Sequence, residues 1–334
     1  GMLSEALLAR AKGAKRLKRH HQVCAEMLEG KSGQLGIAER RSRHLIAAGL
    51  HELALDPLLK AATERRASSD LRQAIRLLDI HEKAADRIGS SLQDERRLRA
   101  QIIRSDILNL LKMGVEASDI ATRTLKASRQ LETPYLIGAS LRVLGVSKLR
   151  SGSTQEALDM FEEALVNLQE AKADELIVQT RCNLVDISRQ VGWWERAKLH
   201  LEKGLTEAEL LDSKLLVGNT HFYAGTLYLQ LDDLETAAGH YLQAKEAYEY
   251  ADNTIGLAHC INALGNLARR QGKFDQAEIS FRKAIKLYQQ IGSGFDVQPL
   301  MSLALAHIDM DNMGAAQTLL ENGCARFRKD DHRL

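Results

Sequence analysis

The residue types that catalyse most reactions are present, but they are not grouped in any known catalytic pattern. Eleven histidines are scattered along the chain, and no pair of them stands with a third ligand at the spacing of a zinc site. There is no serine nucleophile motif and no glycine-rich phosphate loop after a strand. The adjacent carboxylates of Glu162 and Glu163, and of Asp232 and Asp233, point in different directions and cannot share a substrate. We therefore expect no catalytic site, no metal site and no cofactor in this chain.

Two short stretches resemble ligand sites only superficially. The loop from Gly30 to Gly36 contains Gly-Lys-Ser, but it lacks the earlier glycine and the preceding strand of a phosphate-binding loop. It is therefore interpreted as a linker. The run Asp309-Met310-Asp311-Asn312 lacks the glycine and the terminal glutamate of a calcium loop, so helix-end capping is expected there.

Polar residues that could bind a partner recur on one set of predicted helices. Asparagine carries both a donor and an acceptor, so it can hold the backbone of an extended peptide, and arginine offers a fork to carboxylates. The candidate residues are Arg142, Asn183, Asp186, Arg189, Asn219, Phe222, Tyr223, His259, Asn262, Asn266, Arg269 and Arg270. An alternative stays open, because any exposed helix face carries Asn and Arg and because contacts between neighbouring helices can use the asparagines.

A repeated helical pattern must position these candidates. Counted from Gly265, the residues Gly272, Phe274, Ala277, Phe281 and Ala284 follow at offsets 7, 9, 12, 16 and 19. The same residue classes recur in steps of 40, at Gly225, Ala237, Tyr241 and Ala244, at Val185, Gly192, Ala197, Leu201 and Gly204, and at Gly145, Gly152, Ala157, Phe161 and Ala164. Each copy predicts two helices that cross at a small residue.

These spacings resemble the signature of the tetratricopeptide repeat. The resemblance implies an all-α fold, a right-handed α-α superhelix of about seven helix pairs, in which the first helix of each pair lines a concave groove. By type and position the candidates are similar to the asparagine and basic residues with which peptide-binding tetratricopeptide domains clamp a segment. The resemblance thus implies a non-catalytic interaction or regulatory module. Its expected partner is a protein or peptide segment, or an upstream domain of the same full-length protein.

The repeat pattern divides the chain into four parts. Residues 1–36 form amphipathic helices and a linker, 37–134 divergent helix pairs, 135–297 four regular 40-residue repeats, and 298–334 a degenerate capping repeat. In the pair at 92–132 we place Ser105, Ala121, Leu125 and Ser128 at the repeat positions, with about four extra residues around Gly114. In the last part Ala304, Ala316, Leu320 and Gly323 hold these positions.

Two other functions are also carried as hypotheses. The run from His20 to His81 is similar to the helical region that follows the ATPase module in large bacterial signalling regulators. That resemblance implies a sensory or autoinhibitory arm of a larger ATPase, Ser/Thr kinase or transcriptional regulator. The opening Gly1-Met2 is typical of tag removal and is consistent with a fragment of a longer protein. The other hypothesis is a receptor for a small ligand or short peptide, which predicts an enclosed pocket around Phe222 and Tyr223.

Composition and charge favour helices and demand no charged partner. There are only three prolines, and 46 basic residues nearly balance 44 acidic ones. Residues 3–30 have apolar positions at helical spacing and a basic cluster over residues 12–21 without aromatic side chains, so we expect a solvated helix face and no nucleic acid. No apolar run is long enough to span a membrane. The four cysteines, Cys24, Cys182, Cys260 and Cys324, form no CxxC pair, so we expect a reducing, cytoplasmic location.

Overall fold

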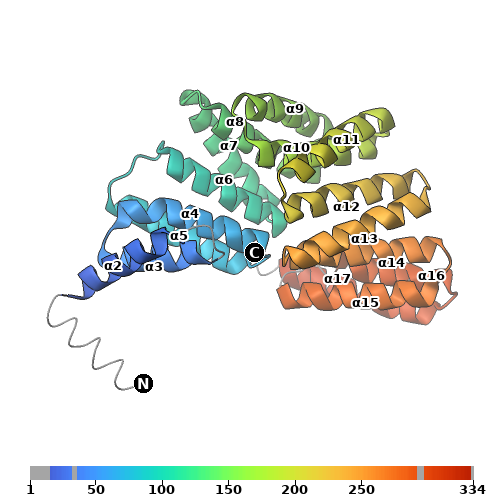
Figure 1. Ribbon diagram of the computed structural model, residues 1–334. Helices are drawn as coiled ribbons and strands as arrows, with labels where there is room; N and C mark the ends of the chain where they lie inside the picture. The colour runs from blue at the N-terminus through green and yellow to red at the C-terminus, as the bar shows by residue number, and fades with distance from the viewer. Residues whose placement is uncertain (1–15, 32–35, 292–296, 332–334) are drawn as a thin grey trace, which may run out of the picture. The chain divides into compact units, whose positions relative to one another are not determined.

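The computed structural model describes residues 16–31, 36–291 and 297–331, and all the regular elements in these ranges are α-helices (Figure 1). With the labels of Figure 1, the helices are α2 (Leu17–Glu29), α3 (Ile37–Ala48), α4 (His51–Ala67), α5 (Leu71–Arg87), α6 (Glu95–Leu110), α7 (Gly114–Gln130), α8 (Pro134–Arg150), α9 (Thr154–Glu170), α10 (Asp174–Val191), α11 (Trp194–Leu210), α12 (Lys214–Gln230), α13 (Leu234–Tyr250), α14 (Thr254–Arg270), α15 (Phe274–Ile291), α16 (Val297–Asp309) and α17 (Met313–Asp331).

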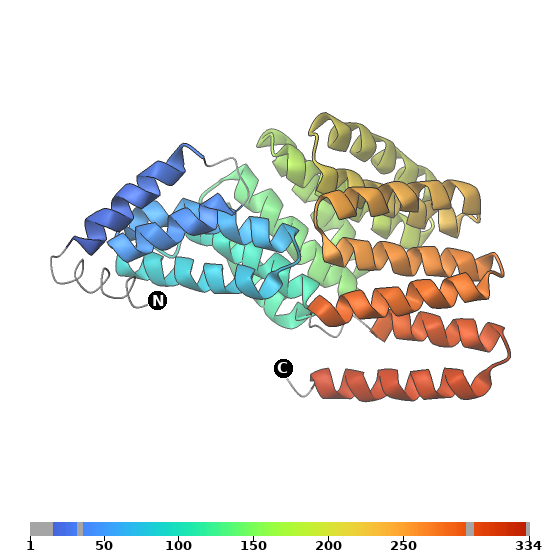
Figure 2. The same ribbon diagram turned by 60° about the horizontal axis from the view of Figure 1, so that its bottom comes forward.

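The helices fall into two compact units, residues 1–153 and 154–334. In the first unit α2 packs on α3, α4 on α5, and α6 on α7. In the second unit α10 packs on α11, α12 on α13, α14 on α15, and α16 on α17, and Figure 2 shows the last helices of this unit in antiparallel succession. The prediction of an all-α solenoid of helix pairs is confirmed. These contacts define seven pairs among the described helices, in agreement with the predicted number, and the first of them includes the helix of residues 17–29.

A left-handed turn residue ends nearly every helix at a constant interval. Between residues 112 and 272 a positive φ recurs every 20 residues, at Lys112, Glu132, Gly152, Lys172, Gly192, Asp212, Asp232, Asp252 and Gly272. After α14 the N–H of Gly272 donates to the carbonyl of Arg269 at 3.0 Å, and the N–H of Lys273 donates to that of Ala268 at 2.9 Å. This hydrogen-bond pattern is the Schellman C-cap. Two such helix-and-turn units therefore make the 40-residue repeat.

The constant interval corrects one prediction. There are no extra residues around Gly114, because α7 begins there, 40 residues before α9 begins at Thr154. Ala117, Ala121 and Thr124 of α7 lie 40 residues before Ala157, Phe161 and Ala164 of α9 and hold the same repeat positions. They precede the predicted residues Ala121, Leu125 and Ser128 by about one helical turn. Leu125 and Ser128 are also buried, so the apolar pattern alone did not distinguish the two registers. The regular spacing of the helices thus begins earlier in the chain than residue 135.

The small crossing residues lie where the sequence predicted. A Cβ added at Gly265 would stand 2.6 Å from the ring of Phe281, and one added at Gly225 would stand 2.6 Å from Tyr241. Ala277, Phe281 and Ala284 are fully buried. In these two pairs the backbone of the first helix therefore rests directly on an aromatic ring of the second helix, which fixes how closely the two helices pack.

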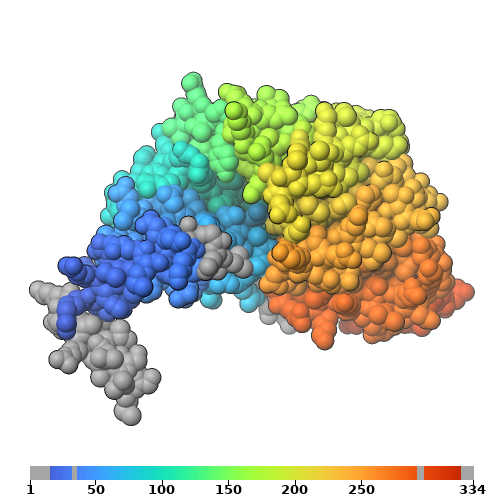
Figure 3. All heavy atoms as spheres, viewed as in Figure 1, coloured from blue at the N-terminus to red at the C-terminus, as the bar shows by residue number. Residues whose placement is uncertain are grey.

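The first helices of successive pairs form the inner layer of the second unit. There α10 contacts α12, α12 contacts α14, and α14 contacts α16. No two successive second helices among the described ones make comparable contacts, so the second helices stand at the wider radius. The atoms of α12 to α15 form a continuous surface in the space-filling view (Figure 3). No helix in the described ranges is both long and apolar enough to cross a bilayer.

Candidate functional site

Eleven of the twelve candidate residues lie on the first helices α10, α12 and α14 of the second unit, and Arg142 lies on α8 in the first unit. Arg142 is buried and its Nη2 donates to Oδ1 of Asp106 at 3.2 Å. Arg66 donates to the other oxygen of Asp106 at 2.9 Å. Burial alone would raise the pKa of the Asp106 carboxyl, but Arg142 and Arg66 outweigh this effect and hold the pKa below its usual value. Arg142 therefore takes part in an ion-pair network inside the first unit.

The three candidate arginines of the second unit connect neighbouring first helices. Arg189 on α10 donates to Oε1 of Gln230 on α12 at 2.7 Å. Arg270 on α14 donates to the carbonyl of Leu229 on α12 at 2.6 Å, where a cation suits the negative end of the helix. Arg269 on α14 donates to Asp309 on α16 at 2.6 Å. These contacts hold the inner layer together at the carboxyl ends of its helices.

Each of two candidate residues is held by a tyrosine from the second helix of its own pair. The hydroxyl of Tyr248 donates to Oδ1 of Asn219 at 3.0 Å. Forty residues later the hydroxyl of Tyr288 lies 2.7 Å from Nδ1 of His259. Burial raises the pKa of both phenols, so they stay protonated at neutral pH. Tyrosine hydroxyls from the second helices thus fix the orientation of Asn219 and His259 in the inner layer.

An aromatic cluster lies in the middle of the inner layer. The ring of Phe222 on α12 lies 5.7 Å from Tyr223, 6.0 Å from Tyr241 and 6.2 Å from His259, all measured between centroids. Phe222 and Tyr223 are only partly buried. The cluster joins α12 to α13 and α14 and leaves apolar edges at the surface of the inner layer.

Unused hydrogen-bonding atoms stand on both sides of this cluster. On α10, Oδ1 of Asn183 and Nε of Arg189 are shielded from solvent and have no hydrogen-bond partner among the described residues. On α14 the same holds for Oδ1 of Asn262 and Nε of Arg269. Leaving such an atom unpaired costs about 1–3 kcal/mol, and native structures contain few of them. Each helix therefore carries one acceptor and one donor whose hydrogen-bonding capacity is unused in the unbound chain.

Two candidates lie beside these atoms. The side chain of Asn266 donates to the backbone carbonyl of Asn262 at 3.2 Å, one turn along α14. Asp186 accepts from Arg189 at 2.5 Å and from Gln190 at 3.1 Å on α10. The structure thus brings the candidates of α10, α12 and α14 to one layer. Among their asparagines, Asn183 and Asn262 have a side-chain oxygen that accepts no hydrogen bond from the described residues.

Comparison with known proteins identifies the repeat. A family model described as tetratricopeptide repeat matches residues 216–290, which span most of α12, all of α13 and α14, and most of α15. Residues 216–290 carry tetratricopeptide repeats. No curated protein sequence matches the chain.

Several solved structures resemble the chain at low sequence identity. The complex of NprR with its cognate peptide NprX matches with a TM-score of 0.61 and 17% identity, over 84% of this chain and 79% of that one. The apo form of RapI matches with a TM-score of 0.58 and 16% identity, over 82% of this chain and 98% of RapI. A signal transduction ATPase with a tetratricopeptide repeat sensor from Pyrococcus horikoshii matches with a TM-score of 0.54 and 13% identity. The match covers 93% of this chain and 52% of the ATPase. These likenesses show a shared α-α solenoid fold.

Sequence reasoning missed the hydrogen bonds that hold Asn219 and His259 from the outer helices. The rings of Tyr248 and Tyr288 are buried, but their hydroxyls reach these two residues of the inner layer. Their common spacing of 29 residues from Asn219 and His259 was the available signal. Burial raises the pKa of both Cys182 and Cys260 to about 12, so these two thiols are unreactive at neutral pH.

The remaining ligand-like motif is explained by helix capping. Oδ1 of Asn312 accepts from the N–H of Ala315 at 3.3 Å, at the start of α17. The capping role predicted for residues 309–312 is confirmed at this residue. The Gly30–Gly36 loop lies partly outside the described residues, at 32–35. No group of three or more His, Cys, Asp or Glu within reach of a shared metal ion occurs in the described ranges.

Proposed function

We propose that the inner face of α10, α12 and α14 binds an extended segment of another protein, and that the chain is a non-catalytic interaction module. The observation that carries this proposal is the pair of unused atoms on each flanking helix, Oδ1 of Asn183 with Nε of Arg189, and Oδ1 of Asn262 with Nε of Arg269. These atoms are shielded from solvent in the unbound chain, so binding requires their side chains to turn outward. An extended peptide presents N–H and C=O groups in alternation and can then satisfy an acceptor and a donor on each helix.

The aromatic cluster between these helices supplies the apolar part of the same surface. The exposed edges of Phe222 and Tyr223 offer contact to one side chain of a bound segment. Backbone contacts at α10 and α14 would then give affinity, and the cluster on α12 would give preference for an apolar residue. Support comes from NprR, a protein of similar fold that was solved with its cognate peptide.

The test is a pull-down that compares the wild-type chain with a variant whose unused acceptors are removed. In Asn183→Leu/Asn262→Leu both unpaired oxygens are replaced by methyl groups of similar volume, so the fold should lose no stability. Asn167→Leu, on the outer helix α9, is the matched control, because Asn167 bonds only within its own helix. A protein captured by wild type and control but absent with the double variant supports the proposal. A protein captured equally by all three contradicts it.

A second candidate function is a regulatory arm within a longer protein. The chain matches about half the length of the Pyrococcus horikoshii ATPase and nearly all of its own length. In such a protein the inner face would bind an upstream domain of the same chain. Reading the flanking coding sequence tests this candidate, since an adjoining ATPase, kinase or DNA-binding segment would support it and its absence would exclude it.

A further inference from the structure

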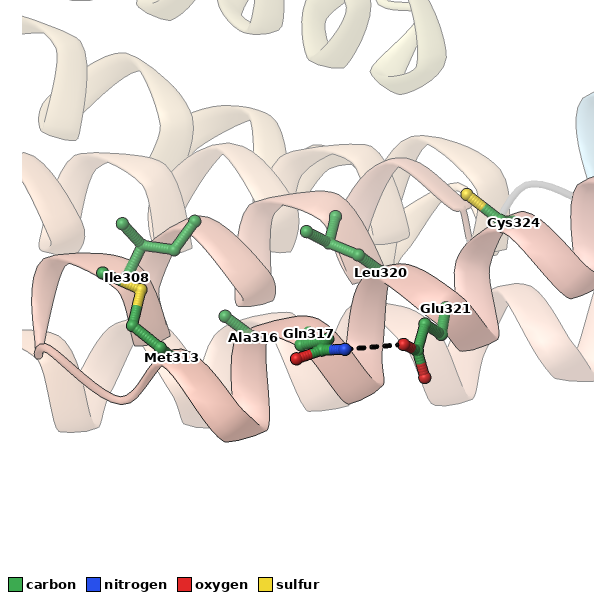
Figure 4. A pocket seen from close by; sticks show the side chains of 7 residues that line it. All are labelled: Ile308, Met313, Ala316, Gln317, Leu320, Glu321 and Cys324. Carbon is green, nitrogen blue, oxygen red and sulfur yellow. Dashed lines mark hydrogen bonds between the residues drawn. The ribbon is translucent and has the colours of Figure 1, made fainter.

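The last helix pair leaves an apolar face open where earlier pairs are filled. At the position that packs against the first helix, Phe161, Leu201, Tyr241 and Phe281 are 0–3% exposed, whereas the corresponding Leu320 on α17 is 41% exposed. A cleft of about 680 Å³ runs along this face. It is lined by Ile308 of α16 and by Met313, Ala316, Gln317, Leu320, Glu321 and Cys324 of α17 (Figure 4).

The lining residues form a stripe that fits another helix. Met313, Ala316, Leu320 and Cys324 follow one another at steps of three and four residues, which places them on one side of α17. In Figure 4 the side chains of Ile308 and Met313 approach each other at one end of the cleft. A solenoid covers such a stripe with the next first helix, so an amphipathic helix is the shape that completes it.

The charge beside the stripe determines which helix is suitable. From residue 308 to 324 there are three carboxylates, Asp309, Asp311 and Glu321, and no Lys or Arg. The rest of α17, to residue 331, adds three cations and two carboxylates, so residues 308–331 together have a net charge of −2. Asp309 is bonded to Arg269, whereas Glu321 lines the cleft and accepts a hydrogen bond from Gln317 at 2.9 Å. If the same face of a second copy covered the stripe, like charges would meet. A basic amphipathic helix would instead bring opposite charges together.

The chain itself contains a segment with that chemistry, of which residues 3–15 lie outside the described residues. Within residues 3–16 the apolar positions Leu3, Leu7, Leu8, Ala11 and Ala14 have helical spacing. The same segment carries four cations, Arg10, Lys12, Lys15 and Arg16, against the single carboxylate of Glu5. Its net charge of +3 is opposite to that of residues 308–324.

We propose that residues 3–16 of a second copy of the chain bind as a helix in the cleft between α16 and α17. The contact is head-to-tail, because the donor segment and the acceptor cleft are different surfaces. Association therefore continues beyond two copies as the protein concentration rises. It uses neither Asn183 nor Asn262, so it is independent of the proposed groove.

Disulfide trapping in the full chain tests this contact. The variant Ala11→Cys/Cys24→Ser places a thiol on the apolar side of the segment, while Cys324 is already an exposed thiol at the cleft. Under mild oxidation we expect a ladder of covalent oligomers whose peptide maps contain the 11–324 linkage. An excess of a synthetic peptide of residues 2–16 should suppress the ladder, and a scrambled peptide of the same composition should not.

Two further substitutions test whether the 11–324 linkage depends on the cleft. Leu320→Glu should reduce the yield of the 11–324 linkage at least tenfold, and Met313→Glu provides a second variant in case the first disturbs α17. Ile279→Glu, at an exposed position of α15, is the control and should leave the yield unchanged. A linkage only within single chains, a linkage between two copies of Cys324, or a yield insensitive to both cleft variants would overturn the proposal.

Discussion

The hydroxyl of Tyr248 donates to Oδ1 of Asn219 at 3.0 Å, and one repeat later Tyr288 and His259 are joined in the same way. In both pairs the tyrosine belongs to the outer helix and its partner to the inner layer. The core of each repeat therefore does more than bury apolar area, because it also sets the orientation of a polar side chain on the inner face.

Removing one of these hydroxyls should weaken the fold measurably. In Tyr248→Phe the ring keeps its packing, but Oδ1 of the partly buried Asn219 loses its donor, so the free energy of unfolding should fall by about 1 kcal/mol. Equilibrium denaturation with urea measures this change. Tyr250→Phe is the control, because Tyr250 is 79% exposed and should show no change. Equal stability of the wild type and Tyr248→Phe would show that the hydrogen bond contributes nothing.

The same substitution at two glycines should have opposite effects. Gly265→Ala forces a methyl group to within 2.6 Å of the buried Phe281 ring and should destabilise the fold by roughly 1–3 kcal/mol. Gly239→Ala, on the open side of α13, meets nothing within 4 Å and should stabilise the helix by about 0.5–1 kcal/mol. Thermal melts of the two variants measure the difference. Two shifts of the same sign would refute the close helix crossing.

A charged residue in place of Ala277 should destabilise the fold more than either glycine substitution. Ala277 is 0% exposed and packs with Ala268 and Phe281, so the arginine of Ala277→Arg has no space and no partner there. We expect a loss at or above the upper end of about 1–3 kcal/mol, seen as a clearly lower melting temperature. Ile279→Arg, two residues away at an exposed position, should melt close to wild type. An unchanged melt of Ala277→Arg would mean that the repeat register is wrong.

The buried histidine His81 should make the first unit sensitive to acid. Its side chain is 0% exposed, and burial, assisted by the charges of Arg97 and Arg96, lowers its pKa to about 4. Unfolding restores an ordinary pKa of about 6.5, so the unfolded chain binds more protons between these two values. The contribution of neutral, buried His81 to the free energy of unfolding is therefore fully present above about pH 6.5 and is lost as the pH falls toward 4.

The variant His81→Leu isolates this contribution from that of the carboxylates. Neither ring nitrogen of His81 has a hydrogen-bond partner among the described residues, so the leucine leaves no donor or acceptor behind. The melting temperature of the variant should fall less than that of wild type between pH 7 and pH 4.5. Parallel pH profiles of the two proteins would contradict the burial argument.

Particular residues show why the sequence predicted the fold better than the site. Gly265 and Phe281 belong to one pair of helices, so their spacing in the chain specifies their contact. Arg189 and Gln230, or Arg270 and Leu229, belong to neighbouring pairs, and no local pattern shows that these arginines are already engaged. The α7 register was missed by one turn because residues four apart occupy the same side of a helix.

The affinity of a captured segment for the inner face is the most direct test of the central claim. A labelled peptide from a protein found in the pull-down would be titrated against wild type, Asn167→Leu and Asn183→Leu/Asn262→Leu, with fluorescence anisotropy as the readout. The account predicts equal affinity for the first two. For the double variant it predicts a loss of about 2 kcal/mol, or roughly thirty-fold in Kd, with no loss of stability. Equal affinity for all three proteins would contradict the assignment of the inner face as the binding surface.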